Sequence, residues 1–563
     1  MHTSLRPRVG HRYIPSRRRS AVSMLALLAI LGVQAVMSLR LENTALADEA
    51  LYLYAGRMEL AHMLHGAAVQ GDYASYFPGA PVLYPVLAAW LNAVGGLALA
   101  RALSLAEMLA VTVMLYSITR SLFNQRVAVY AAALFAVSEP VIFLGKLATF
   151  DATCLFLLAS ATWIAVRWSG RRWPVVLLAA PLAALAIAVK YTGVLFVPTI
   201  AVLPAIVGWP ARGRRVLLYP SAFAAIVAGL LYGGLRLAGP AYGEAIGATI
   251  TSAAWGVVVM VLALIGALTC VLTWKKLASK KRAALGAVLV GTAAVAPAYQ
   301  MCLHGDVSLL KNVGFGVFFA APLAGAGLVR LTGDRFGRPH VGIVLWSIAA
   351  ILGMSGWWSL YHSWPSSQPL VRALSPYLRP NARYLFEVPE VPIYDLRGRS
   401  DARPDQFWST SAITYVNSDG RRLTGDAGFT AAIGAGFFRL VVYNDSATPA
   451  TDAVIAQALE SSPDYQLVAV LHLTDSDGPV NYYIWALRPS PRLQLASVQR
   501  PMLCPWTRAR ILAGQRGSGT CTPWRPRCRT SPVSTARRAT PSTRWAASPS
   551  CSSAPGARTR PTR

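Results

Sequence analysis

Charged residues are scarce in this chain of 563 residues: Asp, Glu, Lys and Arg make up only 14% of it, against 54% hydrophobic residues. Soluble globular proteins carry about 25% charged residues, so the composition excludes an ordinary soluble protein. Repeated apolar runs long enough to cross a bilayer, separated by short basic clusters, indicate instead a polytopic membrane protein.

Acidic residues are the scarcer charge, with 24 Asp and Glu against 53 Lys and Arg and a formal net charge of +29. An excess of this size can indicate nucleic-acid binding. Here, however, the basic residues gather in short clusters between apolar runs, where the positive-inside rule expects them, and in residues 490–563, which contain no Asp or Glu. We therefore expect the lipid bilayer, and no nucleic acid, as a partner.

Cysteine is sparse as well. The seven cysteines include no Cys-x-x-Cys pair, so the sequence implies neither a zinc site of that type nor a disulfide framework.

The apolar runs predict about eleven transmembrane helices within residues 21–362, after a basic cytoplasmic N-terminus at 1–20. No small-residue cleavage site stands out after the first run, so we expect a retained helix rather than a signal peptide. The expected spans are 21–39, 102–119, 127–144, 152–166, 174–189, 192–208, 216–238, 252–274, 284–303, 313–329 and 341–360.

The run Val82–Leu99 leaves two topologies open. As a span it would place the later basic clusters outside the cell, whereas as a helix along the outer surface it keeps them in the cytoplasm. We favour the surface helix, because Pro81, Pro85 and Trp90 suit an interfacial segment. Residues 41–100 then form an external loop of a multi-pass plasma-membrane protein whose C-terminal domain is also extracytoplasmic.

The pattern changes after the last span. Residues 370–488 combine alternating segments with an amphipathic helix at 452–461, so they are expected to form an α/β domain. The predicted strands lie at 438–443, 466–472 and 482–487.

Residues 490–563 lack any periodicity and consist largely of Arg, Pro, Ser, Thr and Ala. This composition predicts a disordered basic tail. A shift of reading frame and a tail that binds an acidic surface are two further explanations.

Two adjacent carboxylates, Asp48 and Glu49, follow the first apolar run and precede Tyr52 and Arg57. Ionisable groups so close to hydrocarbon are costly and are often functional. The alternative is that both carboxylates only cap the next helix at the membrane boundary.

Further polar groups are expected on the same outer face. Asp151 opens an otherwise apolar helix, either as its N-cap or aimed into a cleft shared with Asp48. A lysine such as Lys190 could simply extend its ammonium to the interface. Carboxylates beside cations at one membrane surface suit a reaction between a water-borne acceptor and a lipid-borne phosphate donor. The remaining members of this set are His304, Asp306 and Lys311.

The stretch Asp48-Glu-Ala-x-Tyr52 resembles the first external loop of the dolichyl-phosphate-mannose protein mannosyltransferases (glycosyltransferase family 39) and of the RgtA/B/C/D-like membrane glycosyltransferases. The resemblance covers about residues 20–360. It departs at Pro78-Gly79-Ala80-Pro81, where many relatives have Lys-Pro-Pro-Leu. The other motifs, in order, are the proline-rich 76–85, Arg101-Ala-Leu-Ser104, Tyr116-x3-Arg120-Ser-Leu-Phe123, Ala148-Thr-Phe-Asp151 and Ala188-Val-Lys190-Tyr-Thr-Gly193.

The resemblance implies a GT-C fold, a polyprenyl-phosphate hexose donor and an inverting transfer on the outer face. It implies Asp48 as the general base and Asp151 as a second catalytic candidate, with Glu49 holding the acceptor or the loop. The residues expected to bind substrate are Tyr52, Arg57, Lys190 and Lys311. One of the three cations among them would replace the lysine of Lys-Pro-Pro-Leu, which this sequence lacks.

This scheme requires no cofactor, although oligosaccharyltransferases of the same fold use a metal ion, so a divalent metal stays open. The acceptor could be a protein, a cell-wall glycan or a glycolipid. The main alternative function is a membrane transporter or lipid-sugar flippase, which would place ionisable groups in mid-helix and show an internal repeat. Neither pattern is found. A non-catalytic membrane protein whose outer domain binds a glycan or a partner is the third possibility.

Overall fold

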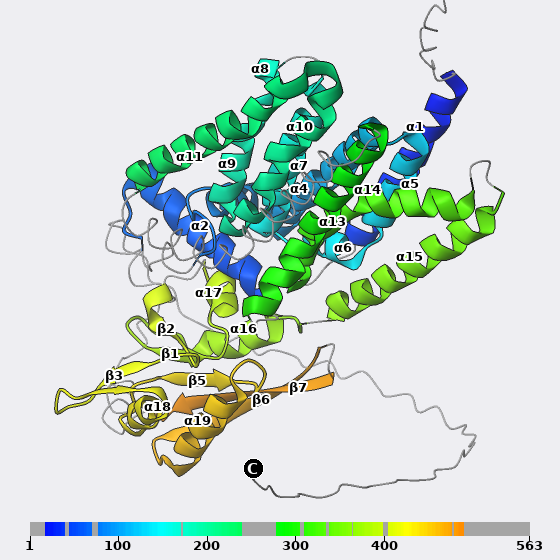
Figure 1. Ribbon diagram of the computed structural model, residues 1–563. Coiled ribbons are helices and arrows are strands. Elements are labelled where there is room, and N and C mark those ends of the chain that lie inside the picture. The colour runs from blue at the N-terminus through cyan, green and yellow to red at the C-terminus, as the bar shows by residue number, and fades with distance from the viewer. Residues whose placement is uncertain are drawn as a thin grey trace, which may run out of the picture. The chain divides into compact units, whose positions relative to one another are not determined.

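The computed structural model describes residues 17–39, 44–69, 77–170, 173–238, 277–303, 309–333, 337–362, 364–397, 403–475 and 478–488. Within these residues, eight helices are long and apolar enough to cross a membrane, or nine if one bent helix pair counts as a single span. A sheet-containing region follows the last of them (Figure 1). The predicted class, a polytopic helical membrane protein with a C-terminal α/β region, is confirmed.

The first half of the helical region contains a break that the sequence anticipates. α4 is interrupted at Gly95 and Gly96, and Gly96 has φ 68° and ψ −170°, a conformation that side chains other than glycine rarely adopt. The break separates the helix predicted at 82–99 from the membrane span that follows it. Its position at the membrane surface stays a prediction. The helices here are α1 (Arg17–Leu39), α2 (Ala47–His65) and α4 (Tyr84–Leu122).

The span predicted at 127–144 is a bent pair rather than one straight helix. α5 (Gln125–Ala136) and α6 (Glu139–Lys146) meet at an angle of 64°. Ser138 between them has extended backbone angles, and Pro140 in the first turn of α6 has no N–H with which to continue the hydrogen bonding of α5.

The remaining helices lie at the predicted spans, but the one predicted at 174–189 consists of two short helices and is not among the eight long enough to cross a membrane. The span predicted at 252–274 and the tail at 490–563 lie outside the described residues. The remaining helices are α7 (Phe150–Trp168), α8 (Trp173–Val176), α9 (Ala179–Val189), η1 (Tyr191–Phe196), α10 (Val197–Arg212), η2 (Gly213–Leu217), α11 (Leu218–Ala238), α13 (Leu277–Leu303), α14 (Leu309–Thr332) and α15 (Pro339–His362).

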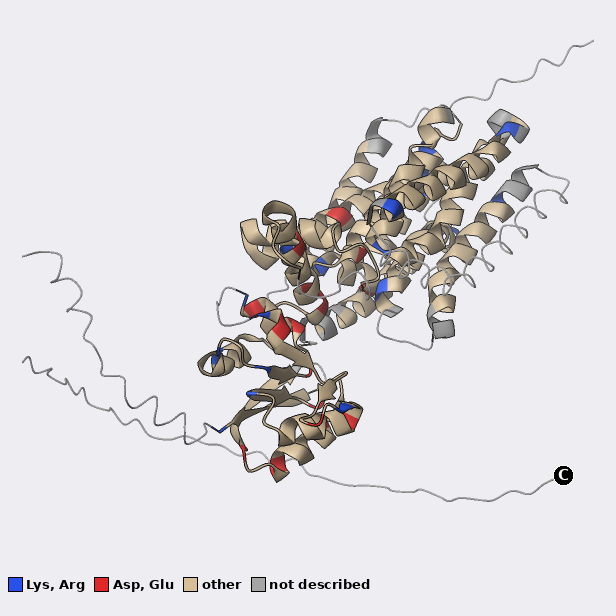
Figure 2. Cartoon of the chain, turned by 90° about the vertical axis from the view of Figure 1, so that its left-hand side faces the viewer, with Lys and Arg blue, Asp and Glu red and all other residues tan. Residues whose placement is uncertain are grey.

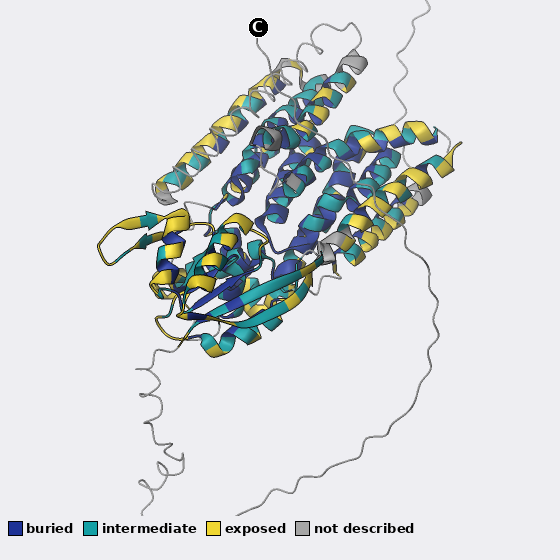
Figure 3. Ribbon diagram, turned by 90° about the horizontal axis from the view of Figure 1, so that it is seen from below, coloured by how far each residue is buried: buried dark blue, intermediate teal, exposed yellow. Residues whose placement is uncertain are grey.

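The helices bury a large apolar core, in which α7 packs against α4 and α9, and α14 packs against α13 and α5. A smaller separate cluster joins α1, α4 and α5. Figure 3 shows buried residues toward the inside of the helical region and exposed ones along its outer helices. α15 exposes a row of large apolar side chains, as expected of a helix that faces lipid. They include Ile343, Val344, Ile348, Ile351 and Leu352.

The C-terminal region is built on a five-stranded sheet in the order β2-β1-β5-β7-β6. β1 (Tyr384–Phe386) is parallel to both β2 (Phe407–Ser409) and β5 (Leu440–Tyr443). β7 (Gly478–Leu487) is antiparallel to β5 and to β6 (Tyr465–Asp475). The three strands predicted from the sequence correspond to β5, β6 and β7.

Helices surround this sheet, and a two-stranded ribbon completes the region. The helix predicted at 452–461 is α19 (Pro449–Ser461). The ribbon is β3 (Thr414–Val416) with β4 (Arg422–Thr424), and the other helices are α16 (Gln368–Leu374), η3 (Ser375–Tyr377), α17 (Glu390–Asp395), η4 (Pro404–Gln406) and α18 (Gly425–Gly434).

Candidate active site

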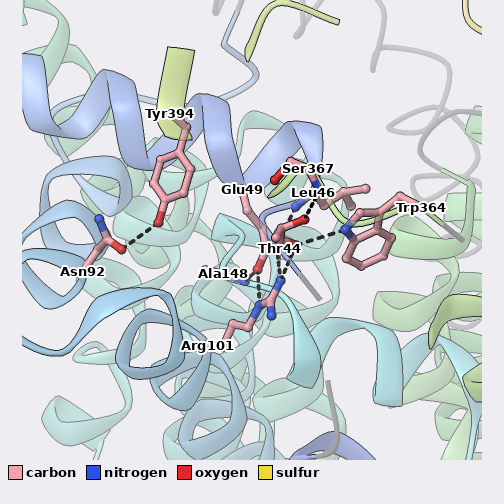
Figure 4. Close-up of polar contacts among 9 residues, drawn as sticks. All are labelled: Thr44, Leu46, Glu49, Asn92, Arg101, Ala148, Trp364, Ser367 and Tyr394. Carbon is pink, nitrogen blue, oxygen red and sulfur yellow. Dashed lines mark hydrogen bonds and ion pairs between the residues drawn. The ribbon is translucent and has the colours of Figure 1, made fainter. Parts of the chain in front are cut away.

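The first turn of α2 carries Asp48 and Glu49, and the two carboxylates have different partners. Glu49 is fully buried and accepts two hydrogen bonds from Arg101 of α4, 2.8 Å from Nε and 2.6 Å from Nη2. It also accepts the backbone N–H groups of Leu46 at 3.0 Å and Ala148 at 2.7 Å (Figure 4). Four hydrogen bonds fill the acceptor sites of a carboxylate. Glu49 therefore fastens the start of α2 to α4 and to the segment before α7.

Asp48 keeps access to solvent. Its side chain is 38% exposed, and Oδ2 is paired with Nζ of Lys311 in the first turn of α14. Adjacent residues of a helix point about 100° apart, so Asp48 faces away from the buried contacts of Glu49. Of the two acids in this turn, Asp48 is the one that a substrate can reach.

Asp151 lies in the first turn of α7 and is fully buried. Thr149 occupies the N-cap position, so Asp151 is not the N-cap of this helix. Oδ1 accepts a hydrogen bond of 2.5 Å from Nζ of Lys190. Oδ2 has no hydrogen-bond partner among the described residues. Because a buried polar atom without a partner is costly, this open oxygen is a candidate contact for a ligand.

Lys190 stands where α9 ends and the chain turns into η1, with extended backbone angles. Its side chain is buried, and Nζ donates to Oδ1 of Asn312 at 3.0 Å as well as to Asp151. The ammonium also lies 5.7 Å and 5.2 Å from the ring centroids of Phe150 and Phe315. These contacts are those of a buried, fixed cation and not of a lysine extended to the interface.

Adjacent residues of α14 join the two ion pairs, because Lys311 contacts Asp48 and Asn312 contacts Lys190. We call these four residues, together with Asp151, the two-pair site. Asn312 was missed in the sequence, where a neutral amide beside a lysine gives no charge signal. Its position directly after Lys311 is the only clue that the sequence holds.

Tyr52 lies beside this site, whereas Arg57 points elsewhere. The ring of Tyr52 is buried, 5.4 Å from that of Phe77 and 4.6 Å from that of Phe150. Burial, followed by the negative charges of Asp48 and Asp151, raises the pKa of Tyr52 well above its usual value, so its hydroxyl stays neutral. Arg57 is exposed and donates to the backbone carbonyl of Arg397 at 3.1 Å.

The backbone around Lys190 is held by the segment 78–80. The N–H of Tyr191 donates to the carbonyl of Pro78, and the N–H of Ala80 donates to the carbonyl of Ala188, both at 2.8 Å. Gly79 passes so close that a Cβ there would lie 1.9 Å from the carbonyl oxygen of Val189. Only glycine allows this approach. The segment Pro78-Gly79-Ala80-Pro81, where many relatives have Lys-Pro-Pro-Leu, thus packs directly against the segment that carries Lys190.

A second group of contacts joins the start of α2 to the segment after α15 and the top of the C-terminal region (Figure 4). The carbonyl of Thr44 accepts the indole N–H of Trp364 at 3.0 Å, and its hydroxyl accepts the backbone N–H of Ser367 at 3.1 Å. The hydroxyl of Tyr394 in α17 donates to Asn92 of α4 at 2.9 Å. Thr44, four residues before Asp48, is thereby held by the segment that follows α15.

Charged side chains are few along the helices, as Figure 2 shows, which makes their pairing at this site informative. Within the described ranges, no group of three or more His, Cys, Asp or Glu side chains could hold a metal ion. His304 and Asp306, expected on the same face, lie outside the described residues.

Residues 80–232 match the family model described as dolichyl-phosphate-mannose-protein mannosyltransferase. Over these residues the match confirms the resemblance predicted from the motifs and the prediction of a glycosyltransferase. The range includes Arg101, Asp151 and Lys190, whereas Asp48 and Lys311 lie outside it. No curated protein matches the chain in sequence.

Two solved membrane proteins are similar to the chain at low identity. The oligosaccharyltransferase of Archaeoglobus fulgidus in complex with zinc and sulfate is 13% identical, covering 81% of this chain and 72% of its own, with a TM-score of 0.46. ArnT from Cupriavidus metallidurans bound to undecaprenyl phosphate is 14% identical, covering 84% of this chain and 99% of its own, with a TM-score of 0.34. Similarity at this level transfers no ligand or activity to this chain.

Proposed function

We propose that the protein is a membrane glycosyltransferase that moves a hexose from a polyprenyl-phosphate donor to a hydroxyl group of an acceptor on the outer face of the membrane. The two-pair site carries this proposal, because it brings two carboxylates, two lysines and an amide together from four helical segments. The family model supports the donor class, since its description names a dolichyl-phosphate sugar.

Asp48 is the proposed general base, because it is the exposed carboxylate of the site. The acceptor oxygen forms a bond to C1 of the hexose while the bond from C1 to the phosphate oxygen breaks, with inversion at C1. The acceptor proton passes to Asp48, and the polyprenyl phosphate leaves with the bonding electron pair.

Lys311 links donor binding to the base. It is paired with Asp48 in the structure, and a donor phosphate would compete for the same ammonium. Binding of the donor would therefore release Asp48 for proton transfer, while Lys311 stabilises the negative charge that develops on the leaving phosphate. Lys190, held by Asp151 and Asn312, supplies a second fixed positive charge nearby.

The positions of these groups favour an enzyme over a transporter. Asp48, Asp151 and Lys311 lie in the first turns of α2, α7 and α14, and Lys190 caps the end of α9. Ionisable groups of transporters line a pathway through the middle of the helices. A site at helix ends instead suits a reaction at the membrane surface.

The decisive experiment is sugar transfer by Asp48→Asn. The substitution keeps size and hydrogen bonding but removes the basicity, and loss of a proton-transfer role costs about 10²–10⁴ in rate. Incorporation of labelled sugar from polyprenyl-phosphate mannose or glucose should fall at least about a hundredfold. Donor binding should not weaken, because the substitution releases Lys311 from its competing carboxylate. Asp151→Asn should lose less.

The matched control is Asp405→Asn, whose carboxylate lies in the C-terminal region and is half-exposed. It should transfer sugar as the parent does. Transfer by Asp48→Asn within a few-fold of the parent would remove Asp48 as the base. Incorporation that does not depend on the gene would overturn the enzyme itself.

A further inference from the structure

A cavity of about 230 Å³ lies at the carboxyl edge of the five-stranded sheet. One wall is made by the ends of the parallel strands β1 and β5 and the residues after them. The other is made by residues 44–47, which lead into α2, and 364–367, which follow α15. Open α/β sheets bind ligands in the crevice outside the carboxyl ends of parallel strands, so the cavity has the position of a binding site.

The lining favours a neutral, hydroxyl-rich ligand. Among the described residues that line the cavity there is no Lys or Arg, so nothing there attracts a phosphate or another anion. Phe386, Tyr443 and Tyr482 supply aromatic surface, and Asn444 and Ser446 supply an amide and a hydroxyl. A sugar ring has apolar C–H faces that pack on aromatic rings and hydroxyl groups that bond to polar side chains.

Both walls are fixed before any ligand binds. Glu387, a buried carboxylate in the wall, accepts the backbone N–H groups of Asn444 at 2.8 Å and Thr448 at 2.9 Å, and also that of Ala447. These bonds hold the loop after β5. The opposite wall is held by the hydrogen bonds between Thr44 and the segment 364–367. A preformed cavity binds with little loss of conformational freedom.

The size and the position of the cavity limit what it can hold. Its 230 Å³ is less than the roughly 300–1,000 Å³ of pockets for drug-sized ligands, which leaves room for about one sugar ring. Ala47 lines it, and Asp48 is the next residue. The cavity therefore ends at the backbone one residue before the proposed general base, whose side chain is not part of the lining.

We infer that this cavity holds one neutral hexose unit of a glycan acceptor, next to the unit whose hydroxyl group reacts at Asp48. The inference rests on the proposed function and chooses the glycan among its three possible acceptors. A protein acceptor would place a peptide side chain there instead, and the experiment separates the two.

The test uses the purified full-length protein in detergent and two tryptophan variants. Ser446→Trp places a large ring at the cavity from an exposed loop position. Ser418→Trp makes the same change at an exposed position in the β3–β4 turn, away from the cavity, and is the matched control. The probes are mannotriose, maltotriose and a serine- and threonine-containing peptide of similar mass, with binding measured by titration calorimetry.

The parent and Ser418→Trp should bind a trisaccharide with the same Kd, and Ser446→Trp should bind it at least about tenfold more weakly. Equal binding by Ser446→Trp, binding of the peptide alone, or no trisaccharide binding by the parent would each overturn the inference.

Sugar transfer separates this inference from the proposed function. With a trisaccharide acceptor, Ser446→Trp should raise the acceptor KM at least tenfold and leave kcat within a few-fold. Transfer unaffected by Ser446→Trp would overturn the glycan cavity and leave the enzyme standing. If the parent protein transferred no sugar from any donor, the proposed glycosyltransferase function would be wrong. The binding of the trisaccharide would then still test whether the cavity holds a sugar unit.

Discussion

The adjacent carboxylates Asp48 and Glu49 at the start of α2 have different roles, because adjacent residues of a helix point in different directions. Glu49 is enclosed by Arg101 and two backbone N–H groups, whereas Asp48 has a single lysine partner and reaches solvent. The four bonds of Glu49 favour the second of its two expected roles, that of holding the loop. Replacing Glu49 should therefore have other consequences than replacing Asp48.

Glu49→Gln should destabilise the protein. It leaves the buried guanidinium of Arg101 without a counter-charge, and removing one partner of a buried ion pair costs about 3–5 kcal/mol. The melting temperature of the purified protein, followed by intrinsic fluorescence, should fall by several degrees. Asp405→Asn breaks a half-exposed pair with Arg403 at 3.5 Å and should change it little. Equal melting temperatures for both variants would show that Glu49 is no anchor.

Much of the two-pair site could be predicted from single residues, but its pairing could not. Asp48, Asp151, Lys190 and Lys311 stand out in the sequence because each is an ionisable group at the edge of an apolar run. Which acid meets which base depends on the packing of α14 near α2 and α9. No local pattern encodes a contact between residues 263 positions apart.

At the scale of elements, the junction of α9 and η1 is the part on which the site depends most directly. The segment 78–80 bonds to both sides of Lys190 and approaches it through Gly79. A side chain at this position would separate the two segments and move the lysine.

Gly79→Ala should therefore reduce both stability and sugar transfer. The added Cβ would lie 1.9 Å from the carbonyl oxygen of Val189, and overpacking of this kind costs about 1–3 kcal/mol. Gly170→Ala, where nothing lies within 4 Å of the added atom, is the control and should behave as the parent. Melting temperature and transfer are measured on the same samples. Full activity in Gly79→Ala would contradict the close approach.

α19 carries a buried acid whose titration should affect stability. Burial, and then the charge of Glu387, raise the pKa of Asp452 from 3.8 to about 7. Between these values the folded state keeps a proton that the unfolded state releases, so the free energy of unfolding falls as pH rises from about 4 to about 7.

Asp452→Asn should lose this part of the pH dependence and melt a few degrees above the parent at pH 8. Asp426→Asn, an exposed acid in the first turn of α18, should leave the pH dependence unchanged. Melting temperatures between pH 5 and pH 8 provide the measurement. The same slope in Asp452→Asn and the parent would assign the titration to another group.

Length decided which elements the sequence could predict. β6 and β7, with 11 and 10 residues, are long enough for alternation to show and were found, whereas β1 to β4 have three residues each, too few for a period-2 pattern to emerge. β5 was also found, although its four residues are all apolar and buried. The bend between α5 and α6 was missed because both halves are apolar. Only Ser138 and Pro140 mark it in the sequence.

At the scale of the whole molecule, charge is sorted along the helices. α7 has the site residue Asp151 in its first turn and Arg167 in its last. In the same way, α14 has Lys311 in its first turn and Arg330 in its last. The two ends of the bundle therefore differ in chemistry, as the positive-inside rule requires for a site on the outer face. The orientation itself stays a prediction.

Cysteine labelling tests that orientation. In a background without the seven native cysteines, Ser418→Cys in the C-terminal region should react with a membrane-impermeant reagent in intact cells. Ser121→Cys, an exposed position at the end of α4, should react only after the cells are opened. Protection of Ser418→Cys would mean that the helix at 82–99 crosses the membrane and that the topology is inverted.

The distance along the chain between paired charges also sets the order in which the site assembles during synthesis. Glu49 and Arg101 are 52 residues apart and Asp151 and Lys190 are 39 apart, whereas Asp48 and Lys311 are 263 apart. At about 5–20 residues per second, the ribosome needs roughly 13–53 s to reach Lys311 after making Asp48. Of the ion pairs described in the helical region, the one with the proposed base is thus the last to form. Until α14 leaves the ribosome, the nascent protein carries that carboxylate without its counter-ion.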